Sequence, residues 1–410
     1  MSGTPCRFCG AELRQSFVDL GRSPLANAFL APDELRRMEP FYPLHAYVCR
    51  DCLLVQLEAF ESPEHIFSDY LYFSSYSASW LQHARAYVGQ VTKRFRLGPG
   101  SLVVEVASND GYLLQYVKEH GIGALGVEPA ANVAEATLSK GIPTEIAFFG
   151  TATARRLAEA GSRADLMVAN NVLAHVPDLN DFVAGFKILL KPTGVATFEF
   201  PHLLRLIREC QFDTIYHEHF SYLSLLAVDR IFAHHGLAVF DVEELPTHGG
   251  SLRVYAAPAE AAPARSDGVE KVLTDERGAG LSRPDGYADF GKAVVEVKCR
   301  LLEFLIGLRR TRKTIAGYGA PAKGNTLLNY CGIGPELLPY TVDLSPHKQG
   351  RYLPGVGIPI HPPQRIFETR PDYVLILQWN LKDEIGSQMA AIRDWGGRFI
   401  VAIPSLTVLD

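Results

Sequence analysis

Short β-rich runs alternate with helical patterns between residues 100 and 250, as in doubly wound α/β domains. The clearest unit covers residues 101–141, where LVVEVA predicts a buried parallel strand, YLLQYVKEHG a helix, and ALGVEP a second strand that ends at Glu128. Residues 164–201 repeat the pattern with a strand, a loop, a helix, a KPTG turn and a strand that ends at Glu199. We therefore expect an α/β fold here, with a generic α/β domain as the alternative.

The pattern changes outside this region. Residues 68–91 begin with aromatic side chains and end as an amphipathic helix. Residues 256–285 are rich in alanine, proline and charge, which predicts a linker or a crossover. A long helix follows at about 287–310, then a strand at TIAGYG and a glycine-opened helix at GAPAKGNTLLNY, which predicts a second Rossmann-like domain. We therefore expect three units, at residues 1–70, 71–255 and 256–410.

The composition is that of a globular chain. Of its 410 residues 47% are apolar and 21% are charged, which supports a sizeable core and argues against disorder. The net charge is −5, and no block of lysine and arginine suggests a nucleic-acid groove or an anionic membrane surface. The longest apolar runs fall short of the ~20 residues of a membrane span, and MSGTPCRFCG lacks an apolar signal core. We expect a monomeric, cytoplasmic protein without nucleic-acid or membrane partners.

Four of the seven cysteines form two CxxC pairs about 40 residues apart: Cys6, Cys9, Cys49 and Cys52. Four thiolates in this pattern can close a tetrahedron around zinc, which predicts a structural Zn2+. A disulfide pair is the alternative, which a reducing cytoplasm disfavours. So small a module needs a metal or a similar crosslink to fold. The remaining cysteines are expected to be buried or incidental, and they are Cys210, Cys299 and Cys331.

The turn SNDG after the first central strand predicts a ligand site, because nucleotide-type ligands lie over the carboxyl ends of such strands. Glu128, at the end of the second strand, is placed to accept both hydroxyls of a ribose. The turn lacks the GxGxxG fingerprint of a pyrophosphate site, which favours a ligand with a ribose but no phosphate, such as S-adenosylmethionine. The residues expected to bind this cofactor are Glu105, Asn109, Gly111, Tyr112, Glu128, Asn170 and Asn171.

The stretch FDTIYHEHFSYLS, residues 212–224, carries two histidines and a glutamate between tyrosines. The residues alone leave three interpretations open: an acid/base site, a metal site or a polar loop. His217 and His219 are two positions apart and on a strand would share a face, where they could chelate a metal. Tyr76 stands among small hydroxyl residues in SSYSAS, which is poor core material, so it is a further site candidate. Other aromatic residues nearby are expected in the core and one histidine is expected to be structural: Tyr70, Tyr72, Phe73 and His175.

Three basic residues in the last unit suggest contacts to phosphate. Backbone N–H groups at the start of the glycine-opened helix can hold phosphate oxygens, and Lys323 adds charge there. An empty Rossmann-like crevice is the alternative. Lys348 and Arg351 in DLSPHKQGRY are either phosphate partners or part of a solvated basic turn. His248 precedes two glycines in LPTHGGSLRVY, which permits a ligand to approach the backbone, although core placement is equally open.

In order and over nearly its whole length, the chain resembles the sugar C-methyltransferases that branch deoxysugars. The motifs are CRFC and CRDC, ASNDGYLL, FDTIYHEHFSYLS, LPTHGGSLRVY, GYGAPAKGNTLLNYCGIG and DLSPHKQGRYLPGVGIPI. The resemblance implies an N-terminal zinc-binding module, a central class I methyltransferase (Rossmann-like) domain and a C-terminal Rossmann-like domain that binds a nucleotide sugar. It also implies that these domains enclose a dTDP-4-keto-deoxyhexose as substrate beside S-adenosylmethionine.

Methylation of carbon needs a base, because a sugar carbon becomes nucleophilic only after a proton leaves next to a carbonyl. The resemblance puts Tyr216, Glu218 and His219 in the active-site loop. His219 is expected to be the base at carbon 3, with Tyr216 or Tyr76 at the keto oxygen. Glu218 is expected to orient the imidazole. Methylation of oxygen or nitrogen and a non-catalytic binding module remain alternatives, and the identity of the sugar and attack at carbon 3 or carbon 5 stay open.

Overall fold

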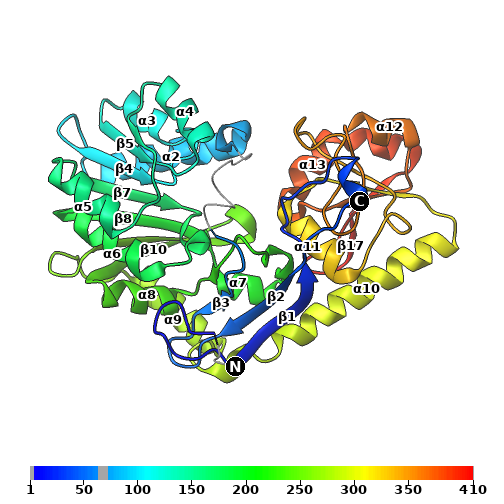
Figure 1. The fold of residues 1–410 in the computed structure, drawn as a ribbon, viewed down its shortest axis with the longest axis horizontal. Coiled ribbons are helices and arrows are strands. Elements are labelled where there is room, and N and C mark those ends of the chain that lie inside the picture. The colour runs from blue at the N-terminus through cyan, green and yellow to red at the C-terminus, as the bar shows by residue number, and fades with distance from the viewer. Residues whose placement is uncertain (1–3, 63–72, 410) are drawn as a thin grey trace.

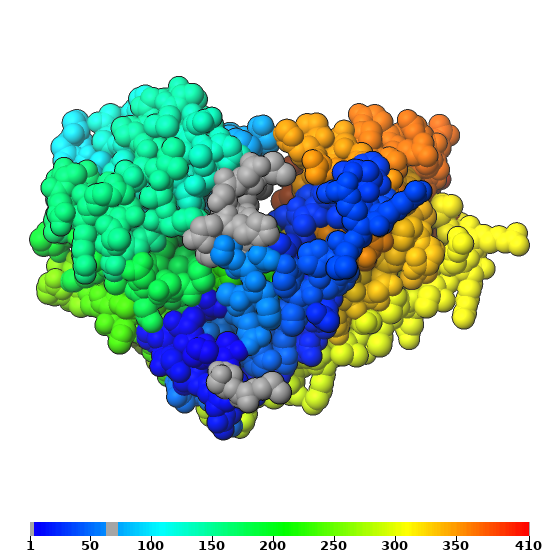
Figure 2. Space-filling model, in the orientation of Figure 1, coloured from blue at the N-terminus to red at the C-terminus, as the bar shows by residue number. Residues whose placement is uncertain are grey.

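The computed structural model describes residues 4–62 and 73–409, and their strands form three sheets (Figure 1). The central domain lies on the left of this view and the C-terminal domain on the right, with the N-terminal sheet between them at the bottom. In the space-filling view the N-terminal module fills the lower part of the space between the two lobes (Figure 2). Tyr70 and Tyr72 lie outside the described residues. Of the helices that the structure describes, none is long and apolar enough to cross a membrane.

The central domain is built on a seven-stranded sheet with the order β10-β11-β8-β7-β4-β5-β6. Its strands are β4 (Leu102–Val106), β5 (Gly123–Val127), β6 (Thr144–Glu145), β7 (Ala164–Asn170), β8 (Leu190–Pro201), β10 (Leu237–Leu245) and β11 (Ser251–Pro258). Strands β8, β7, β4, β5 and β6 run parallel, while β11 is antiparallel to both neighbours. This sheet confirms the predicted doubly wound α/β fold. The predicted KPTG turn lies within β8, as an irregular stretch between the pairs Ala164–Leu190 and Leu166–Val195, so the strand begins earlier than the sequence suggests.

One helix of the central domain comes from a segment that the sequence predicts to be a linker. The helices are α2 (Ala78–Arg94), α3 (Leu114–Glu119), α4 (Ala131–Ser139), α5 (Thr151–Glu159), α6 (Leu179–Leu189), α7 (Leu203–Arg208), α8 (Leu225–His234) and α9 (Asp267–Gly278). Helix α9 lies within residues 256–285, and its Val269, Val272 and Leu273 are buried in the central core. The prediction is therefore wrong there, because a low apolar content concealed a narrow but complete apolar face.

The C-terminal domain has a Rossmann-like sheet with the order β14-β13-β12-β15-β16-β17. Its strands are β12 (Ile315–Tyr318), β13 (Thr341–Val342), β14 (Ile360–His361), β15 (Tyr373–Ile376), β16 (Arg398–Val401) and β17 (Thr407–Leu409). Its helices are α10 (Phe290–Arg310), α11 (Ala322–Cys331), α12 (Gln364–Thr369) and α13 (Lys382–Gln388). All strand pairs are parallel except the one between β16 and β17. The predicted strand at TIAGYG and the helix that follows it are confirmed.

The N-terminal sheet takes its fourth strand from a distant part of the chain. Strands β1 (Gln15–Ser23), β2 (Tyr42–Val48) and β3 (Val55–Leu57) are antiparallel, and β9 (Ser221–Tyr222) completes the sheet. Strand β9 is antiparallel to β3. Because β9 follows the YHEH residues almost immediately, that segment is anchored in the N-terminal module and not in the central sheet.

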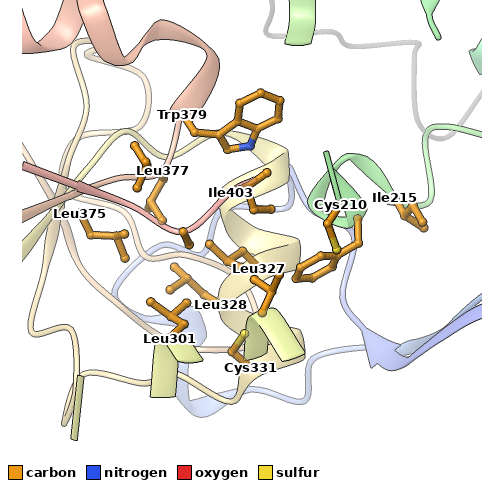
Figure 3. Close-up of a cluster of buried hydrophobic side chains, with 14 of the residues drawn as sticks. Cys210, Ile215, Leu301, Leu327, Leu328, Cys331, Leu375, Leu377, Trp379 and Ile403 are labelled. Atoms are coloured by element: carbon orange, nitrogen blue, oxygen red, sulfur yellow. The ribbon is translucent and has the colours of Figure 1, made fainter. Parts of the chain in front are cut away.

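Two hydrophobic cores meet at the N-terminal module. Its sheet belongs to the core of the C-terminal domain, and the ring of Phe17 stacks on that of Phe290 in α10 with 4.5 Å between centroids. Three of its cysteines, Cys6, Cys49 and Cys52, instead pack in the core of the central domain. Figure 3 shows part of the C-terminal core, where Leu327 of α11 lies between strand residues such as Leu375 and the residue Ile215 of the YHEH region. The module therefore holds the two larger domains together.

Candidate active site and metal centre

Two turns bring the four cysteines of the CxxC pairs together. The Sγ atoms of Cys6 and Cys52 are 3.5 Å apart, as are those of Cys9 and Cys49, and all four lie within 4.8 Å of one another. A disulfide has a sulfur–sulfur distance of about 2.05 Å, so the disulfide alternative does not fit. The four thiolates fit a tetrahedral Zn2+ with bonds to sulfur of about 2.3 Å. Four protein ligands leave such an ion no open position, which makes its role structural.

The cysteine centre is connected to the YHEH segment. Arg7, between the first two cysteines, donates to the carbonyl oxygen of Pro177 at 2.8 Å, and its guanidinium lies 5.3 Å from the ring centroid of Phe220. The side chain of Gln56 on β3 donates to Sγ of Cys6 at 3.1 Å. Because Phe220 directly follows YHEH and β3 pairs with β9, the metal centre supports this segment from two sides.

The loop after β4 is held by a carboxylate of the neighbouring strand. Gly111 has a φ of 72°, and a Cβ at this position would lie only 2.9 Å from Cγ2 of Thr137. Oε2 of Glu128 accepts from the backbone N–H of Asn109, and Oε1 accepts from that of Ala130, both at 2.9 Å. A carboxylate oxygen has two lone pairs, so each still has capacity for another donor. Glu128 can therefore shape the loop and accept two ribose hydroxyls at once.

Burial raises the pKa values of the two glutamates next to this loop. Burial raises the pKa of Glu128, although its two backbone hydrogen bonds oppose the shift. Glu105 on β4 is 1% exposed, and burial raises its pKa well above the usual range, with the Tyr112 hydroxyl acting in the opposite direction. Glu105 therefore supports the loop from inside the sheet, while Glu128 lies at the open end of β5.

Asn170 and Asn171 lie at the carboxyl end of β7, the strand next to β4. Oδ1 of Asn170 is buried and has no hydrogen-bond partner within residues 4–62 and 73–409. Nδ2 of Asn171 lies 3.4 Å from Nε2 of His248. The His248 ring lies 5.3 Å from the ring of Trp80, which stacks on Tyr112 at 6.0 Å. Three predicted site residues are thus brought together around Trp80, which the sequence did not single out.

The YHEH segment presents one imidazole that is ready to accept a proton. Nδ1 of His219 lies 2.8 Å from the carbonyl oxygen of Thr214, and because a carbonyl only accepts, Nδ1 carries the proton. Nε2 therefore has the lone pair, and the hydroxyl of Tyr216 donates to it at 2.9 Å. Burial, and then the neighbouring His175, lower the pKa of His219 well below its usual value. His219 is neutral at neutral pH and has a defined tautomer.

His175 belongs to this site, although the sequence predicts a structural role for it. Its ring centroid lies 4.6 Å from that of His219, edge to face at 71°, and burial lowers its pKa to about 4. His175 lies in the short helical turn Leu173–His175 that follows β7. The signal that could have found it is this position, because loops at the carboxyl ends of parallel strands carry ligand contacts in doubly wound folds.

Glu218 and His217 have their partners in the N-terminal module. Oε1 of Glu218 accepts from the side chain of Asn27 at 2.6 Å, and burial raises the pKa of Glu218 to about 7. Nε2 of His217 donates to the carbonyl oxygen of Pro43 at 3.1 Å. The structure does not place Glu218 on the imidazole of His219, whose two ring nitrogens have other partners. In the part of the chain that the structure describes, the four cysteines are the one group of three or more side chains placed to bind a metal ion. His217 and His219 belong to no such group among these residues, so the structure does not support chelation of a metal by these two histidines.

Tyr76 is the predicted catalytic residue that stays apart. It ends a short helical turn (Ser74–Tyr76) that rests on the loop after β4, where the backbone N–H of Ser74 donates to Oδ1 of Asn109 at 2.8 Å. The side chain of Tyr76 is 76% exposed, and its ring packs on Phe73 at 5.6 Å. The structure therefore brings Tyr216, and not Tyr76, to the imidazole.

The basic residues after β13 lie at the start of α11. Nζ of Lys348 donates to the carbonyl oxygen of Ala320 at 2.9 Å and lies 5.2 Å from the ring centroid of Phe29. Arg351 donates to the carbonyl oxygen of Phe29 at 3.3 Å. Asp343, next to β13, accepts from the backbone N–H of Ala320 at 2.8 Å and lies 3.7 Å from Lys348. Both basic side chains are thus brought together at the carboxyl ends of β12 and β13.

Lys323 faces another part of the molecule. Its Nζ donates to Oδ1 of Asn380 at 2.9 Å and lies 4.6 Å from the ring centroid of Trp379. Trp379 donates through Nε1 to Oδ2 of Asp213 at 2.7 Å, and Asp213 directly precedes the residue whose carbonyl orients the imidazole. Asp213 and Trp379 are 166 positions apart, and no local pattern in the sequence signals their contact.

Three family models match the chain in succession. A zinc binding domain matches residues 6–67, a methyltransferase domain matches residues 80–242, and a C-methyltransferase C-terminal domain matches residues 246–404. Together with the distances between the sulfur atoms, the first match identifies the cysteine cluster as the zinc site.

Similar proteins span different shares of the chain. The C-methyltransferase NovU of Streptomyces niveus is 37% identical over 405 residues, which are 99% of this chain and 96% of that protein. The magnesium protoporphyrin IX methyltransferase of Synechocystis PCC 6803, solved with bound S-adenosylmethionine, has a TM-score of 0.33 and 14% identity over 43% of this chain and 78% of its own. An S-adenosylmethionine-dependent methyltransferase of Mesorhizobium loti has a TM-score of 0.35 and 15% identity over 43% of this chain and 99% of its own.

Proposed function

Because the chain belongs to the family of S-adenosylmethionine-dependent C-methyltransferases, we propose that its substrate is a dTDP-linked 4-keto-deoxyhexose, methylated at carbon 3. S-adenosylmethionine and Zn2+ are its cofactors. The observation that carries the proposal is the neutral imidazole of His219, whose Nε2 lone pair is directed to the Tyr216 hydroxyl. A base of this kind is needed for transfer to carbon, because the carbon must first lose a proton.

The cofactor site consists of the loop after β4 and the ends of β5 and β7. Glu128 would accept the ribose hydroxyls, and the backbone of Asn109 and Gly111 would line the adenosine side. Asn170 and Asn171 would hold the methionine end. The buried Oδ1 of Asn170, which has no partner among the described residues, supports this because an ammonium needs acceptors. Bound S-adenosylmethionine supplies the electrophilic methyl group.

The base works through its fixed tautomer. The substrate proton moves to Nε2 of His219, and the imidazolium that forms keeps its Nδ1 hydrogen bond to the carbonyl oxygen of Thr214. Tyr216 has to release Nε2 when substrate binds, and its hydroxyl is then free for a sugar oxygen. The 76% exposure of Tyr76 gives no support to a direct contact with the keto oxygen, so we propose Tyr216 for the tyrosine of the site.

The nucleotide end of the substrate would lie in the C-terminal domain. The first backbone N–H groups of α11, together with Lys348 and Arg351, offer donors and positive charge to the diphosphate. His248 would contribute to substrate binding beside the cofactor site, since it lies 3.4 Å from Asn171. We propose three domains, as the sequence suggests at 1–70, 71–255 and 256–410, but with the second boundary moved to follow α9 at Gly278, because that helix packs in the central core. We propose a cytoplasmic monomer as the active form.

A panel of dTDP-4-keto-deoxyhexoses tests the function. The purified enzyme with S-adenosylmethionine should add the mass of one methyl group, less a proton, to one of them, and carbon-13 NMR should find the new methyl on carbon 3. Methylation at carbon 5 would correct the position. Methylation of a sugar hydroxyl or an amine would contradict the proposal.

Proton exchange separates transfer to carbon from transfer to oxygen or nitrogen. In D2O without S-adenosylmethionine, the substrate should exchange its carbon 3 proton at a rate that depends on enzyme concentration. An O- or N-methyltransferase has no need to activate a carbon acid, so turnover without exchange would favour that alternative.

A further inference from the structure

We propose that Lys323 is a catalytic residue, whose ammonium binds the keto oxygen of the substrate and stabilises the enolate formed when His219 removes the neighbouring proton. This inference rests on the proposed function and changes the role expected from the sequence, in which Lys323 contacts phosphate. Four observations support it: the position of the ammonium, the residues that hold it there, the charge it faces, and the second lysine at the phosphate end.

The ammonium is held at a defined point where the C-terminal domain contacts the residues that precede the YHEH segment. Nζ of Lys323 is fixed by Oδ1 of Asn380 at 2.9 Å and by the face of Trp379 at 4.6 Å. An ammonium carries three protons, and Asn380 takes one of them, which leaves donors for a ligand. Lys323 and His219 both keep part of their surface accessible although protein surrounds them. Such a combination is typical of residues that line the floor of a cleft.

The contact between the domains fixes the ammonium relative to the base. Trp379 donates to Asp213, which is fully buried, at 2.7 Å. Asp213 belongs to the helical turn Phe212–Thr214, and the last carbonyl of this turn orients the imidazole of His219. Gly249 of the central domain fits against the indole of Trp379, because a Cβ at this position would overlap Cη2. Figure 3 shows Trp379 at the edge of the C-terminal core, directed away from Leu375. One turn thus contacts both the imidazole of His219 and the indole on which Lys323 packs.

The charges around the ammonium favour an anion at this position. The titratable groups that Lys323 faces are the carboxylate of Asp213 and the imidazoles of His219 and His248. Burial lowers the pKa of Lys323, and Asp213 opposes the shift. Both imidazoles have lowered pKa values and are neutral at neutral pH, so one carboxylate faces the ammonium. A developing oxyanion beside His219 would meet a desolvated positive charge, which is the arrangement that stabilises enolates.

The proposed step balances without any further reactant. The proton on carbon 3 moves to Nε2 of His219, and the electron pair of the C–H bond forms the double bond between carbon 3 and carbon 4. The electron pair of the carbonyl double bond moves to the oxygen, which becomes an enolate. Lys323 donates a hydrogen bond to this oxygen and keeps its proton. Lys348 keeps its proposed contact with the diphosphate. Its ammonium lies 2.9 Å from the carbonyl oxygen of Ala320, just before the start of α11.

Deuterium exchange at saturating substrate tests this assignment. The probe is the dTDP-4-keto-deoxyhexose that the wild-type enzyme methylates, incubated in D2O without S-adenosylmethionine and followed by NMR. Lys323→Met should lower the exchange rate by about 10² to 10³, the usual effect of removing one oxyanion donor, without changing the affinity for dTDP. The matched control Lys292→Met makes the same change at an exposed position of α10, and it should leave both the exchange rate and the affinity for dTDP unchanged. Melting temperature and zinc content establish that both variants fold.

The pH profile gives a second readout, which packing alone would not change. In the wild type, exchange should fall at high pH as Lys323 loses its proton, at a pH below the usual 10.5 because burial lowers its pKa. In Lys323→Arg this fall should move to higher pH, because a guanidinium stays charged. In Lys323→Met the fall at low pH should move upward, because the lysine charge helps to lower the pKa of His219.

The outcomes separate this inference from the function on which it rests. If the wild-type enzyme neither methylates nor exchanges any keto sugar of the panel, the proposed function fails and the inference with it. If the wild type exchanges the proton and Lys323→Met does so equally fast at saturation, the inference alone is overturned. If Lys323→Met instead loses dTDP affinity with an unchanged rate at saturation, Lys323 contacts phosphate, as the sequence suggests.

Discussion

Replacing Glu128 by glutamine tests the cofactor site with a change of one atom. In the structure each carboxylate oxygen accepts one backbone N–H at 2.9 Å, from Asn109 and from Ala130. Glutamine keeps one acceptor oxygen and gains an NH2 group that cannot accept. One of the two backbone donors therefore loses its partner, and so does one of the two ribose hydroxyls that we assign to this carboxylate.

The size of the effect follows from these bonds. A hydrogen bond to a charged group contributes about 1.5 to 3 kcal/mol, and a factor of ten in affinity corresponds to about 1.4 kcal/mol. Losing one ribose bond should therefore raise the Kd for S-adenosylmethionine at least about tenfold. Losing a backbone bond should also loosen the loop after β4, because Gly111 and its neighbours depend on Glu128 for their conformation.

Isothermal titration calorimetry measures the Kd of the wild type and of Glu128→Gln. The matched control is Glu135→Gln, which makes the same change at an exposed position of α4. Burial raises the pKa of Glu128. As the pH is lowered, Glu128 should therefore become protonated, and the wild-type affinity should fall, at a higher pH than for an ordinary glutamate. The glutamine variant should lack this pH dependence. Equal affinities for wild type and Glu128→Gln, with an intact fold, would refute the ribose assignment.

Three further predictions concern other parts of the molecule. Removal of Zn2+ by a chelator should lower the melting temperature and the exchange rate together, because β9 anchors the YHEH segment in the zinc module; rapid loss of activity at an unchanged melting temperature would contradict a structural zinc. His219→Asn should keep S-adenosylmethionine binding and lower both exchange and methyl transfer by about 10² to 10⁴, whereas His217→Asn, whose ring bonds to the N-terminal module, should do less. Exchange near the wild-type rate in His219→Asn would assign the base elsewhere. Gly249→Ala should lower kcat and make the chain more sensitive to limited proteolysis, because the φ of 90° at Gly249 and the indole of Trp379 leave no room for a Cβ. An unchanged kcat and unchanged proteolysis would show that the contact between the domains tolerates the added methyl group.

Local patterns were sufficient for the parts of the site made by near neighbours in the sequence. The two CxxC pairs bring their own turns, and the strand, loop and strand around Gly111 form one compact unit. Glu128 and Asn109 are only 19 positions apart, so the contact between them follows from the order of the elements. The doubly wound fold is confirmed for the same reason, since each strand carries its own apolar run.

Contacts between segments that are distant in the chain could not be predicted from the sequence. Glu218 is next to His219 in the chain, which suggested that it orients the imidazole, yet its partner Asn27 is 191 positions away. Trp80 and Trp379 each look like core residues, and only the tertiary structure shows which polar groups they meet. In each case the contact depends on how segments far apart in the chain pack together, and the residue types within a few positions do not determine that packing.

The shared sheet of β3 and β9 limits how this enzyme can be recombined. The strand that follows the YHEH segment is paired with residues that lie more than 160 positions earlier in the chain, so the two segments must remain complementary. A chimera that takes residues 1–62 from a relative would also have to take β9 and the YHEH segment to keep Val55 matched to Tyr222. During synthesis β3 leaves the ribosome long before β9, and its open edge stays unpaired in the meantime. The environment of the YHEH segment can therefore be completed only after β9 has been synthesised and has paired with β3.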